Sequence, residues 1–568
     1  MRRVRVDPRG IPILRGMGVE RRFQGISGAP GLAVGRAWTL PTALLHHGSQ
    51  PLPVVGAEEA VAALGAARAR LEALADELRT AGRADEGEIF AAQALMAGDP
   101  TLAAALRAKA ATGLGGAESL AAAGEEQAAA LASLGDEYLA ARAADVRDVV
   151  SRALRLLSGA ELPLPDAPVV VVAEDLPPSI AAEIPAHLLL GVALRAGSRT
   201  AHAVILARAA GIPCLVAATE LPVDGSLDGE EVLLDGGAGT IVLRPGAAAK
   251  AAAERERGER GAAAERRAGL RGRAVQAPDG TTIHLLANIG SADDARRAAA
   301  AGADGVGLLR SEFLLLERET PPSEAEQVAA LRAIFAALGP GRPLTLRLAD
   351  IGGDKQIPYL HIAPEGNPFL GVRGYRLAML PARPDLRALF ASQVCAALLA
   401  AAAVGGRIRI MAPMIAVRDE VDHLIDLVAE CRTALADRGE AAASVYPLEL
   451  GVMIEVPAAA LTIATLAAGL DFVSIGTNDL TQYAMAADRV NPALAPLQDA
   501  ASPGVIALIA AAVAGAAVAG VEVGVCGEFA GSVEGARTLV RLGIRELSMD
   551  PAAIDEVREA LLEAHAAG

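Results

Sequence analysis

Aromatic residues and cysteines are both scarce in this chain. Its 568 residues include one Trp, five Tyr and eight Phe, yet 52% are hydrophobic, and much of that share is alanine, which favours helices and close packing of small side chains. The cysteines are Cys214, Cys395, Cys431 and Cys526, and no two form a Cys-x-x-Cys pair. This spacing argues against a zinc knuckle or a disulfide framework and fits a reducing cytosol.

Positive charge is also in deficit. The chain has 68 acidic and 52 basic residues, giving a net charge of −16. That balance argues against nucleic-acid binding, because phosphates would be repelled, and favours a basic protein partner or simple solubility. No apolar run of about 18 residues is present, so we expect no transmembrane helix.

The first 22 residues are rich in arginine and lack an apolar stretch or an A-x-A cleavage site. They do not resemble a secretory signal. We expect residues 1–22 to be a disordered leader, with Met17 as an alternative start, and the protein to be cytoplasmic.

A chain of this length is too long for one hydrophobic core, so we expect three to four domains. Residues 25–38 predict a short pair of strands broken by Gly and Pro, and 57–157 have the periodicity of about four helices. Strand patterns resume over 165–244, which predicts a small α/β domain interrupted by a helical bundle. The charged, alanine-rich segment 247–273 predicts a helical linker.

The C-terminal half alternates short apolar strands with helical stretches. Eight such units over roughly 290 residues predict a (β/α)₈ barrel. The expected strands are 284–289, 305–309, 344–349, 407–414, 450–455, 472–476, 523–527 and 546–549.

Reactive side chains recur where these strands end, which is the face that carries the active site in such barrels. Arginine forks bind phosphate and carboxylate oxygens, two carboxylates can hold one Mg²⁺, and a thiol can donate a proton. Any one of these arginines alone is more often a surface ion pair, and the cysteine alone is as often a core thiol. Together they predict a site for a small phosphorylated acid, made of Arg310, Arg347, Glu455, Asn478, Asp479 and Cys526.

His202 is a second candidate centre. The segment Gly197–Ala201 leads into a predicted helix, which places the imidazole near a helix N-terminus that favours bound phosphate. Imidazole is a competent nucleophile near neutral pH. A lone histidine at such a position is more often structural, so this signal alone is weak.

From about residue 25 to its end, the chain resembles Enzyme I of the bacterial phosphoenolpyruvate:sugar phosphotransferase system. The similarity rests on long motifs in the same order: GISGAPGLAVGRA (25–37), EYLAARAADVRDV (137–149), GVGLLRSEFL (305–314), RLADIGGDKQIPYL (347–360), NPFLGVRGYR (367–376), GVMIEVPAA (451–459), FVSIGTNDLTQY (472–483), ADRVNP (487–492) and GVCGEFAG (524–531). Pyruvate phosphate dikinase shares the histidine and barrel parts, but nothing in residues 1–160 resembles its ATP-binding domain.

The resemblance implies a role for each matching residue. His202 corresponds to the phosphorylated histidine and Cys526 to the proton donor that converts enolpyruvate to pyruvate. Phosphoenolpyruvate would contact Arg310, Arg347, Asn478, Asp479 and Arg489, and Mg²⁺ would be held by Glu455 and Asp479. Lys355 and Arg373 lie in the flanking motifs. The implied partners are the carrier protein HPr and a second copy of the barrel.

The implied domains follow the same family. Residues 23–50 and 161–245 would form the phosphohistidine domain, 51–160 the helical HPr-docking domain, 246–275 the linker and 276–568 the phosphoenolpyruvate-binding barrel.

The sequence departs from the family around the histidine. Ala201 and Ala203 replace hydroxyl residues, and Pro177 stands where a Thr is common. Fewer hydrogen bonds around the phosphohistidine leave an alternative open, namely a catalytically weak regulator of the same family.

Overall fold

The computed structural model divides the chain into two compact units, Met1–Ala262 and Ala263–Gly568. The residues described are 20–40, 52–80, 84–132, 137–159, 164–197, 202–209, 211–316, 318, 320–352, 357–363, 365–489 and 491–566.

The first unit contains a mixed eight-stranded sheet with the order β1-β8-β7-β3-β4-β5-β6-β2. Its strands are β1 (Arg21–Gln24), β2 (Ile26–Ala29), β3 (Leu32–Thr39), β4 (Val169–Ala173), β5 (Leu189–Leu194), β6 (Cys214–Val216), β7 (Glu231–Asp235) and β8 (Thr240–Leu243). Strands β3 and β4 are parallel neighbours with Arg36 opposite Val169, although the whole bundle lies between them in sequence. The predicted helical insertion is therefore present.

The expectation that residues 1–22 form a disordered leader is wrong for the last two of them. Arg21 and Arg22 belong to β1, where they pair with Leu243 and Val242 of β8. Isolated arginines gave no strand signal, because the pairing partner lies more than 200 residues away. Residues 1–19 lie outside the described residues.

The described residues between 57 and 158 form five helices, one more than predicted. They are α1 (Ala57–Thr80), α2 (Ala84–Ala97), α3 (Pro100–Ala110), α4 (Gly116–Ala132) and α5 (Glu137–Ser158). The extra helix arises at Asp99–Pro100, since the Asp99 side chain accepts a hydrogen bond from Thr101 N at 2.7 Å and Pro100 fills the first helical position. The core is built largely from Leu and Ala.

Two short helices cover the sheet near the predicted phosphohistidine. They are α6 (Pro178–Glu183) and α7 (His202–Ala209), and they pack against each other. An ion pair of 2.8 Å between Arg152 of α5 and Glu183 of α6 joins the bundle to the α/β part of the same unit. Helix α8 (Ala247–Ala268) occupies the predicted linker, and its 22 residues span about 33 Å.

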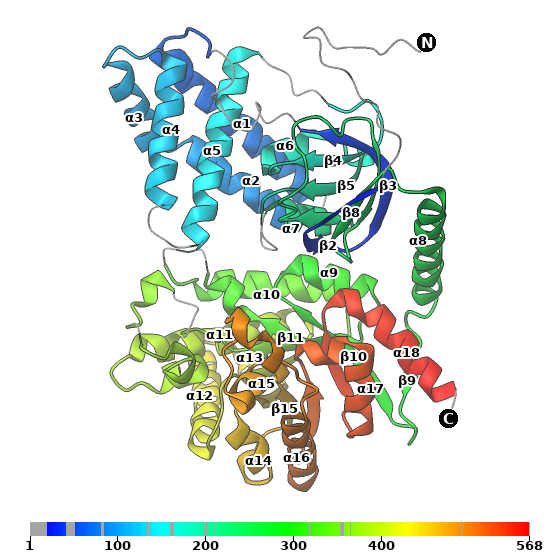
Figure 1. The fold of residues 1–568 in the computed structure, drawn as a ribbon. Helices are drawn as coiled ribbons and strands as arrows, with labels where there is room; N and C mark the ends of the chain where they lie inside the picture. The colour runs from blue at the N-terminus through cyan, green and yellow to red at the C-terminus, as the bar shows by residue number, and fades with distance from the viewer. Residues whose placement is uncertain are drawn as a thin grey trace. The chain divides into compact units, whose positions relative to one another are not determined.

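The second unit is a closed barrel of eight parallel strands, as predicted (Figure 1). The strands are β10 (Thr282–Ile289), β11 (Gly305–Arg310), β12 (Pro343–Arg347), β13 (Arg407–Ala412), β14 (Leu448–Ile454), β15 (Phe472–Ile475), β16 (Glu522–Val525) and β17 (Glu546–Met549). Pairing of His284 with Glu546 closes the ring between β10 and β17. A short antiparallel strand, β9 (Val275–Gln276), adds to β10.

The barrel helices surround this ring. They are α9 (Ala292–Ala300), α10 (Glu324–Leu338), α11 (Pro384–Val404), α12 (Arg418–Asp437), α13 (Ala441–Ser444), α14 (Pro457–Leu466), α15 (Thr477–Met485), α16 (Pro503–Ala519), α17 (Val533–Arg541) and α18 (Ile554–Ala566). The connection from β12 to α11 is irregular and holds three 3₁₀ turns, Pro358–Leu360, Pro368–Leu370 and Gly374–Met379.

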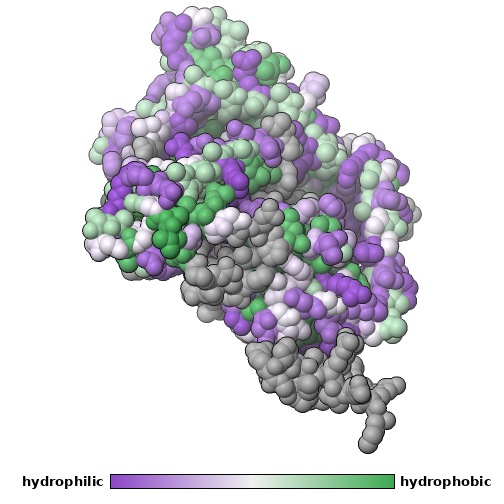
Figure 2. All heavy atoms as spheres, turned by 90° about the horizontal axis from the view of Figure 1, so that it is seen from above, coloured by the Kyte–Doolittle hydropathy of each residue, from purple (hydrophilic) through white to green (hydrophobic). Residues whose placement is uncertain are grey.

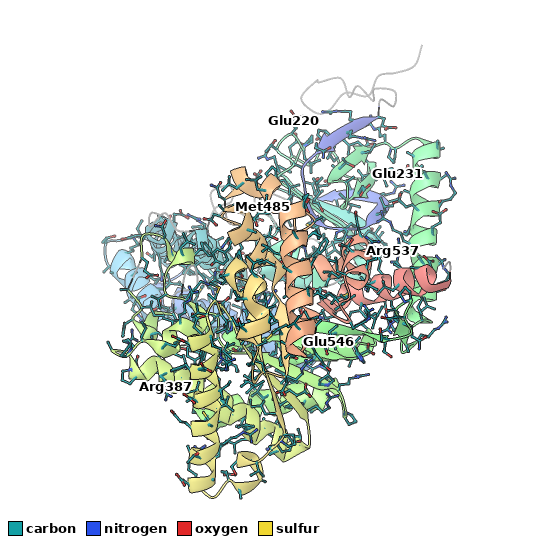
Figure 3. The ribbon with its side chains drawn as sticks, turned by 90° about the horizontal axis from the view of Figure 1, so that it is seen from below. Glu220, Glu231, Arg387, Met485, Arg537 and Glu546 are labelled. Carbon is teal, nitrogen blue, oxygen red and sulfur yellow. The ribbon has the colours of Figure 1, made fainter. Side chains whose placement is uncertain are left out.

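A buried arginine lies inside the barrel toward the N-terminal ends of its strands. The guanidinium carbon of Arg409 lies 3.9 Å from the centre of the Phe472 ring. Its nitrogens lie 2.9–3.4 Å from Glu449, Glu522 and Glu546, the last of which is labelled in Figure 3. This end of a barrel lies opposite the face that carries the active site. We therefore infer that the cluster around Arg409 stabilises the fold.

Two segments are long and apolar enough to cross a membrane by composition alone, 89–110 and 384–404. The first is broken between α2 and α3, and the second is α11, whose inner face is packed in the barrel core. The molecular face in Figure 2 mixes hydrophilic and hydrophobic side chains.

Candidate active site

The barrel carries a cavity of about 330 Å³ at the C-terminal ends of its strands. The structure brings seven sequence-predicted residues together in its wall: Arg310, Arg347, Glu455, Asn478, Asp479, Arg489 and Cys526. The remaining lining residues are Leu308, Asp350, Met453, Gly476, Gly527 and Glu528.

Strand ends position these groups. Arg310 and Arg347 are the last residues of β11 and β12, Glu455 follows β14, and Cys526 follows β16. Asp479 lies in the first turn of α15, directly after β15. Because parallel strands end at one rim, residues as far apart in sequence as Arg310 and Cys526 face one space.

Arg347 is fixed by two acidic side chains. Its Nη2 donates to Oε1 of Glu312 at 2.8 Å, and its Nη1 lies 3.4 Å from Oδ2 of Asp350. The same Glu312 oxygen accepts the backbone N–H of Asp350 at 2.6 Å. Arg347 is only 6% exposed, so it is held rigidly and faces the cavity with little water around it.

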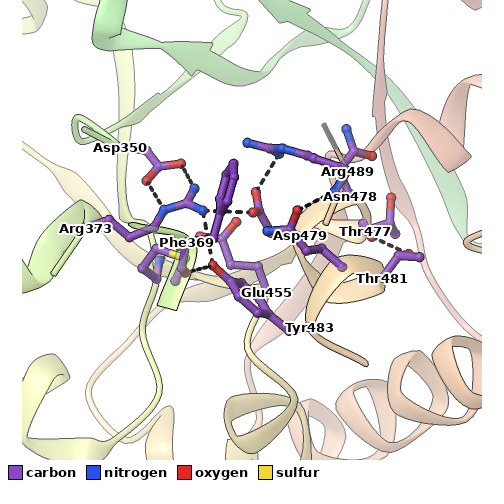
Figure 4. Close-up of polar contacts among 12 residues, drawn as sticks. Asp350, Phe369, Arg373, Glu455, Thr477, Asn478, Asp479, Thr481, Tyr483 and Arg489 are labelled. Carbon is purple, nitrogen blue, oxygen red and sulfur yellow. Dashed lines mark hydrogen bonds and ion pairs between the residues drawn. The ribbon is translucent and has the colours of Figure 1, made fainter. Parts of the chain in front are cut away.

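A second buried arginine bridges Asp350 and Asp479, which both line the cavity (Figure 4). Arg373 donates to both carboxylate oxygens of Asp350, at 2.8 and 3.3 Å, and its Nη1 donates to Oδ1 of Asp479 at 3.1 Å. Burial disfavours its charge, yet these two carboxylates keep the pKa of Arg373 above its usual value. Arg489 completes the arrangement, because its Nη1 donates to Oδ2 of Asp479 at 3.2 Å.

Two glycines let the backbone fold tightly around Arg373. Gly352 has φ +89°, and a Cβ there would meet the backbone oxygen of Val372 at 2.8 Å. Gly374 has φ +60°, and its Cβ would meet Met414 at 2.9–3.0 Å. Both positions therefore favour glycine on conformation and on space.

Glu455 is almost completely buried, at 1% exposure. Its Oε1 accepts the backbone N–H of Met414 at 2.7 Å, and Met414 itself has φ +62°, a rare conformation for a non-glycine residue. Burial, together with the charges of Asp479 and Asp350, raises the pKa of Glu455 to about 8.

The acidic side chains fit one divalent cation. Glu455 and Asp479 offer the oxygen ligands that Mg²⁺ prefers, and their mutual repulsion would be relieved by a cation. Among the described residues, no group of three or more His, Cys, Asp or Glu side chains is arranged to hold a metal. The remaining ligands would come from substrate and water, as is usual for Mg²⁺.

Cys526 lies at the inner wall of the cavity, 3% exposed, beside the apolar side chains of Leu308 and Met453. Its Sγ lies 3.7 Å from the backbone oxygen of Ile475, and its own carbonyl oxygen accepts from Asn288 Nδ2 at 2.9 Å. Burial raises the pKa of the Cys526 thiol to about 11. The group is therefore a protonated thiol near neutral pH, able to donate a proton but poor as a nucleophile.

The other predicted residues are placed only in part. His202 is the first residue of α7, in the first unit, and its side chain lies outside the described residues. Lys355 also lies outside them. Pro177 precedes α6 and provides no side-chain cap to it.

Sequence reasoning missed two residues that contact the site, Phe369 and Tyr483. Tyr483 accepts a hydrogen bond from Arg373 Nη1 at 3.2 Å, and the Phe369 ring lies against two guanidinium groups. Both residues stand in the motifs 367–376 and 472–483, next to residues that were singled out. Their position in these two motifs could have indicated that they contact the site.

Comparison with known families accounts for nearly the whole chain. Residues 265–566 match the PEP-binding domain of PEP-utilising enzymes, 24–142 their N-terminal domain and 165–239 their mobile domain. The mobile-domain match contains His202, and the PEP-binding match contains the whole cavity wall.

Individual relatives agree with these matches. The chain is 36% identical over 548 residues to a phosphoenolpyruvate-protein phosphotransferase of Bacillus sp. (strain S), covering 95% of this chain and 93% of that one. It is 37% identical over 551 residues to the protein of the same name from Streptomyces coelicolor, covering 96% and 94%. It is also 38% identical to a multiphosphoryl transfer protein of Rhodobacter capsulatus, but spans only 59% of that longer chain.

Proposed function

Since the chain belongs to the PEP-utilising enzymes, and among them to the phosphoenolpyruvate-protein phosphotransferases, we propose that His202 receives the phosphoryl group in the barrel and passes it to an HPr-type carrier protein. The composition of the cavity wall is the main support for this proposal. Three arginines, four carboxylates and a protonated thiol line one space of about 330 Å³. This is the donor set that a small phosphorylated enol acid requires.

Substrate binding follows from charge and shape. Phosphoenolpyruvate carries a phosphate and a carboxylate, and guanidinium groups bind both through paired N–H donors. Arg310 is exposed at the rim, whereas Arg347 is held by Glu312 and Asp350. The preorganised Arg347 fixes one end of the substrate, and the freer Arg310 closes on the other.

Mg²⁺ would be held by Glu455 and Asp479, next to the substrate phosphate. When bound, it would supply positive charge that neutralises the phosphate oxygens during transfer. The chain's own arginines contribute in the same sense, because they remain charged at any physiological pH.

The chemistry then proceeds by in-line displacement. An imidazole nitrogen of His202 bonds to phosphorus while the bond from phosphorus to the enol oxygen breaks, and the electron pair stays with enolpyruvate. Cys526 Sγ–H gives its proton to the methylene carbon, which yields pyruvate and a transient thiolate that water reprotonates. A thiol with a pKa of about 11 is protonated at pH 7 and can act as this donor.

Partner and setting follow as parts of the same proposal. The bundle, residues 51–160, would dock the carrier, and the net charge of −16 is compatible with a basic partner. The assembly would be a cytoplasmic homodimer joined through the barrel, acting at the first step of sugar uptake. The remaining segments would be the leader (1–22), the phosphohistidine domain (23–50 and 161–245), the linker (246–275) and the barrel (276–568).

The second candidate is a weak regulator of the same family, favoured by Ala201, Ala203 and Pro177. Pyruvate release from phosphoenolpyruvate and Mg²⁺, with and without purified HPr, separates the two. Multiple turnovers that require HPr support the enzyme. Fewer than one pyruvate per chain in the presence of HPr identifies the regulator.

A further inference from the structure

Phe369 lies where two site arginines meet. It belongs to the 3₁₀ turn Pro368–Leu370 in the irregular connection between β12 and α11. The guanidinium carbon of Arg373 lies 5.7 Å from the centre of its ring, and that of Arg489 lies 5.6 Å from it. In the view of Figure 4 the ring stands between the two guanidinium groups. Both distances are within the range of a cation–π contact.

The backbone of Phe369 is tied to the helix that carries Asp479. The hydroxyl of Tyr483 donates to the carbonyl oxygen of Phe369 at 2.5 Å and accepts from Arg373 Nη1 at 3.2 Å. Tyr483 and Asp479 are four residues apart on α15, so they share one helix face. The ring, the tyrosine and the carboxylate therefore form one unit around the two arginines.

The two arginines are not held equally well. Arg373 is buried, and it contacts both oxygens of Asp350 in addition to Asp479. The Arg489 side chain is 27% exposed and forms an ion pair with Asp479 Oδ2 alone among the described contacts. The two guanidinium groups share the carboxylate of Asp479, and among the described contacts the Phe369 ring is the other group that the Arg489 side chain meets.

We propose that Phe369 is a positioning residue, whose ring holds Arg489 in the orientation that binds phosphoenolpyruvate. The inference rests on the proposed function, in which Arg489 contacts phosphoenolpyruvate. The ring does not touch the reacting atoms and does not supply charge. Its contribution is to binding, so its loss raises the KM for phosphoenolpyruvate and leaves kcat nearly unchanged.

The kinetic test compares Phe369→Leu with Phe369→Tyr. Leucine keeps an apolar side chain but removes the aromatic face, whereas tyrosine keeps that face. We expect the KM for phosphoenolpyruvate to rise about fivefold in the leucine variant, with kcat within about twofold, and to return to the wild-type value in the tyrosine variant. Leu370→Ala is the matched control, because Leu370 is the next residue and is 73% exposed. An unchanged KM in a folded leucine variant overturns the proposal, as does a tyrosine variant that behaves like leucine.

A second readout does not depend on turnover. Phenylglyoxal modifies accessible guanidinium groups, and peptide mass spectrometry reports the rate at each arginine. Arg489 should react about fivefold faster in Phe369→Leu than in the wild type, while Arg310, exposed on the same cavity, keeps its rate. An unchanged Arg489 rate contradicts the positioning role. If the wild type releases no pyruvate but phenylglyoxal modifies Arg489 faster in Phe369→Leu, the proposed function fails and the positioning role of Phe369 is retained.

Tyr483→Phe provides an independent variant should the leucine variant not fold. It removes only the hydroxyl that donates to the Phe369 carbonyl oxygen. The same direction of change is expected, with a higher KM and faster Arg489 modification. If Tyr483→Phe has the wild-type KM and the wild-type rate of Arg489 modification, the Tyr483 hydroxyl does not help Phe369 to position Arg489.

Discussion

Arg489 Nη1 donates to Oδ2 of Asp479 at 3.2 Å, and this contact occupies an oxygen that a metal ion would need. The other oxygen, Oδ1, accepts from Arg373 at 3.1 Å. In the described site, each carboxylate oxygen of Asp479 therefore accepts a hydrogen bond from a guanidinium group. Under the proposed function, a phosphate that shares Arg489 with Asp479 would weaken the hold of Arg489 on Oδ2, and Asp479 would then bind a cation more readily.

Arg489→Ala should strengthen metal binding in the absence of phosphoenolpyruvate. It frees Asp479 Oδ2 from a charge-assisted hydrogen bond, which is worth about 1.5–3 kcal/mol, so Mn²⁺ is expected to bind about tenfold more tightly. Titration of the protein with Mn²⁺, followed by electron paramagnetic resonance, measures this directly. Arg407→Ala, at the exposed start of β13, is the control. Equal or weaker Mn²⁺ binding by the Arg489 variant would show that the ion pair does not compete with the metal.

Cys526 should react slowly with iodoacetamide at pH 8. Its pKa is raised to about 11 by burial, so the protonated thiol is the main form at every pH below that value. The rate is expected to rise as pH increases toward 11, rather than to level off near pH 9 as for an exposed thiol. Cys526→Ala assigns the labelled peptide. A plateau below pH 9 would contradict the protected thiol.

Removal of the same thiol should slow protonation of enolpyruvate. General acid catalysis contributes about 10²–10⁴-fold, so Cys526→Ala is expected to lower pyruvate release by at least about 100-fold while phosphoenolpyruvate binding persists. Calorimetric titration with phosphoenolpyruvate reports binding separately from release. A Cys526→Ala protein with unchanged turnover would remove the cysteine from the mechanism.

Arg409→Met should destabilise the barrel. The substitution leaves Glu449, Glu522 and Glu546 without the cation they share, but these carboxylates are partly exposed to solvent, so we expect a loss of about 1–3 kcal/mol. Guanidinium chloride unfolding measures the loss. Arg407→Ala, whose ion pair with Glu449 is exposed, should change the free energy of unfolding by less than about 1 kcal/mol. Similar losses in both variants would contradict a special role for the buried arginine.

Periodic features of this fold could be predicted from the sequence. The strands that end at Arg310 and Arg347, and those followed by Glu455 and Cys526, are short apolar runs bounded by polar residues, and their order dictates a common rim. The closed barrel and the convergence of these residues follow from that rule alone. No knowledge of side-chain contacts was needed.

Contacts across irregular segments could not be predicted in this way. The Tyr483 hydroxyl reaches the Phe369 carbonyl oxygen over 114 residues, through a connection of 3₁₀ turns without a hydrophobic period. The start of α3 at Asp99–Pro100 was visible as a break but not as a new helix. Strand β1 was missed because its two arginines are stabilised by a partner strand near residue 242.

The central claim is that His202 carries the phosphoryl group. The most direct measurement incubates the full chain and its His202→Ala variant with Mg²⁺ and ³²P-phosphoenolpyruvate, followed by acid and base treatment of the labelled protein. We expect acid-labile, base-stable label on the wild type, transfer of that label to added HPr, and no label on the variant. Label that persists on His202→Ala would contradict it.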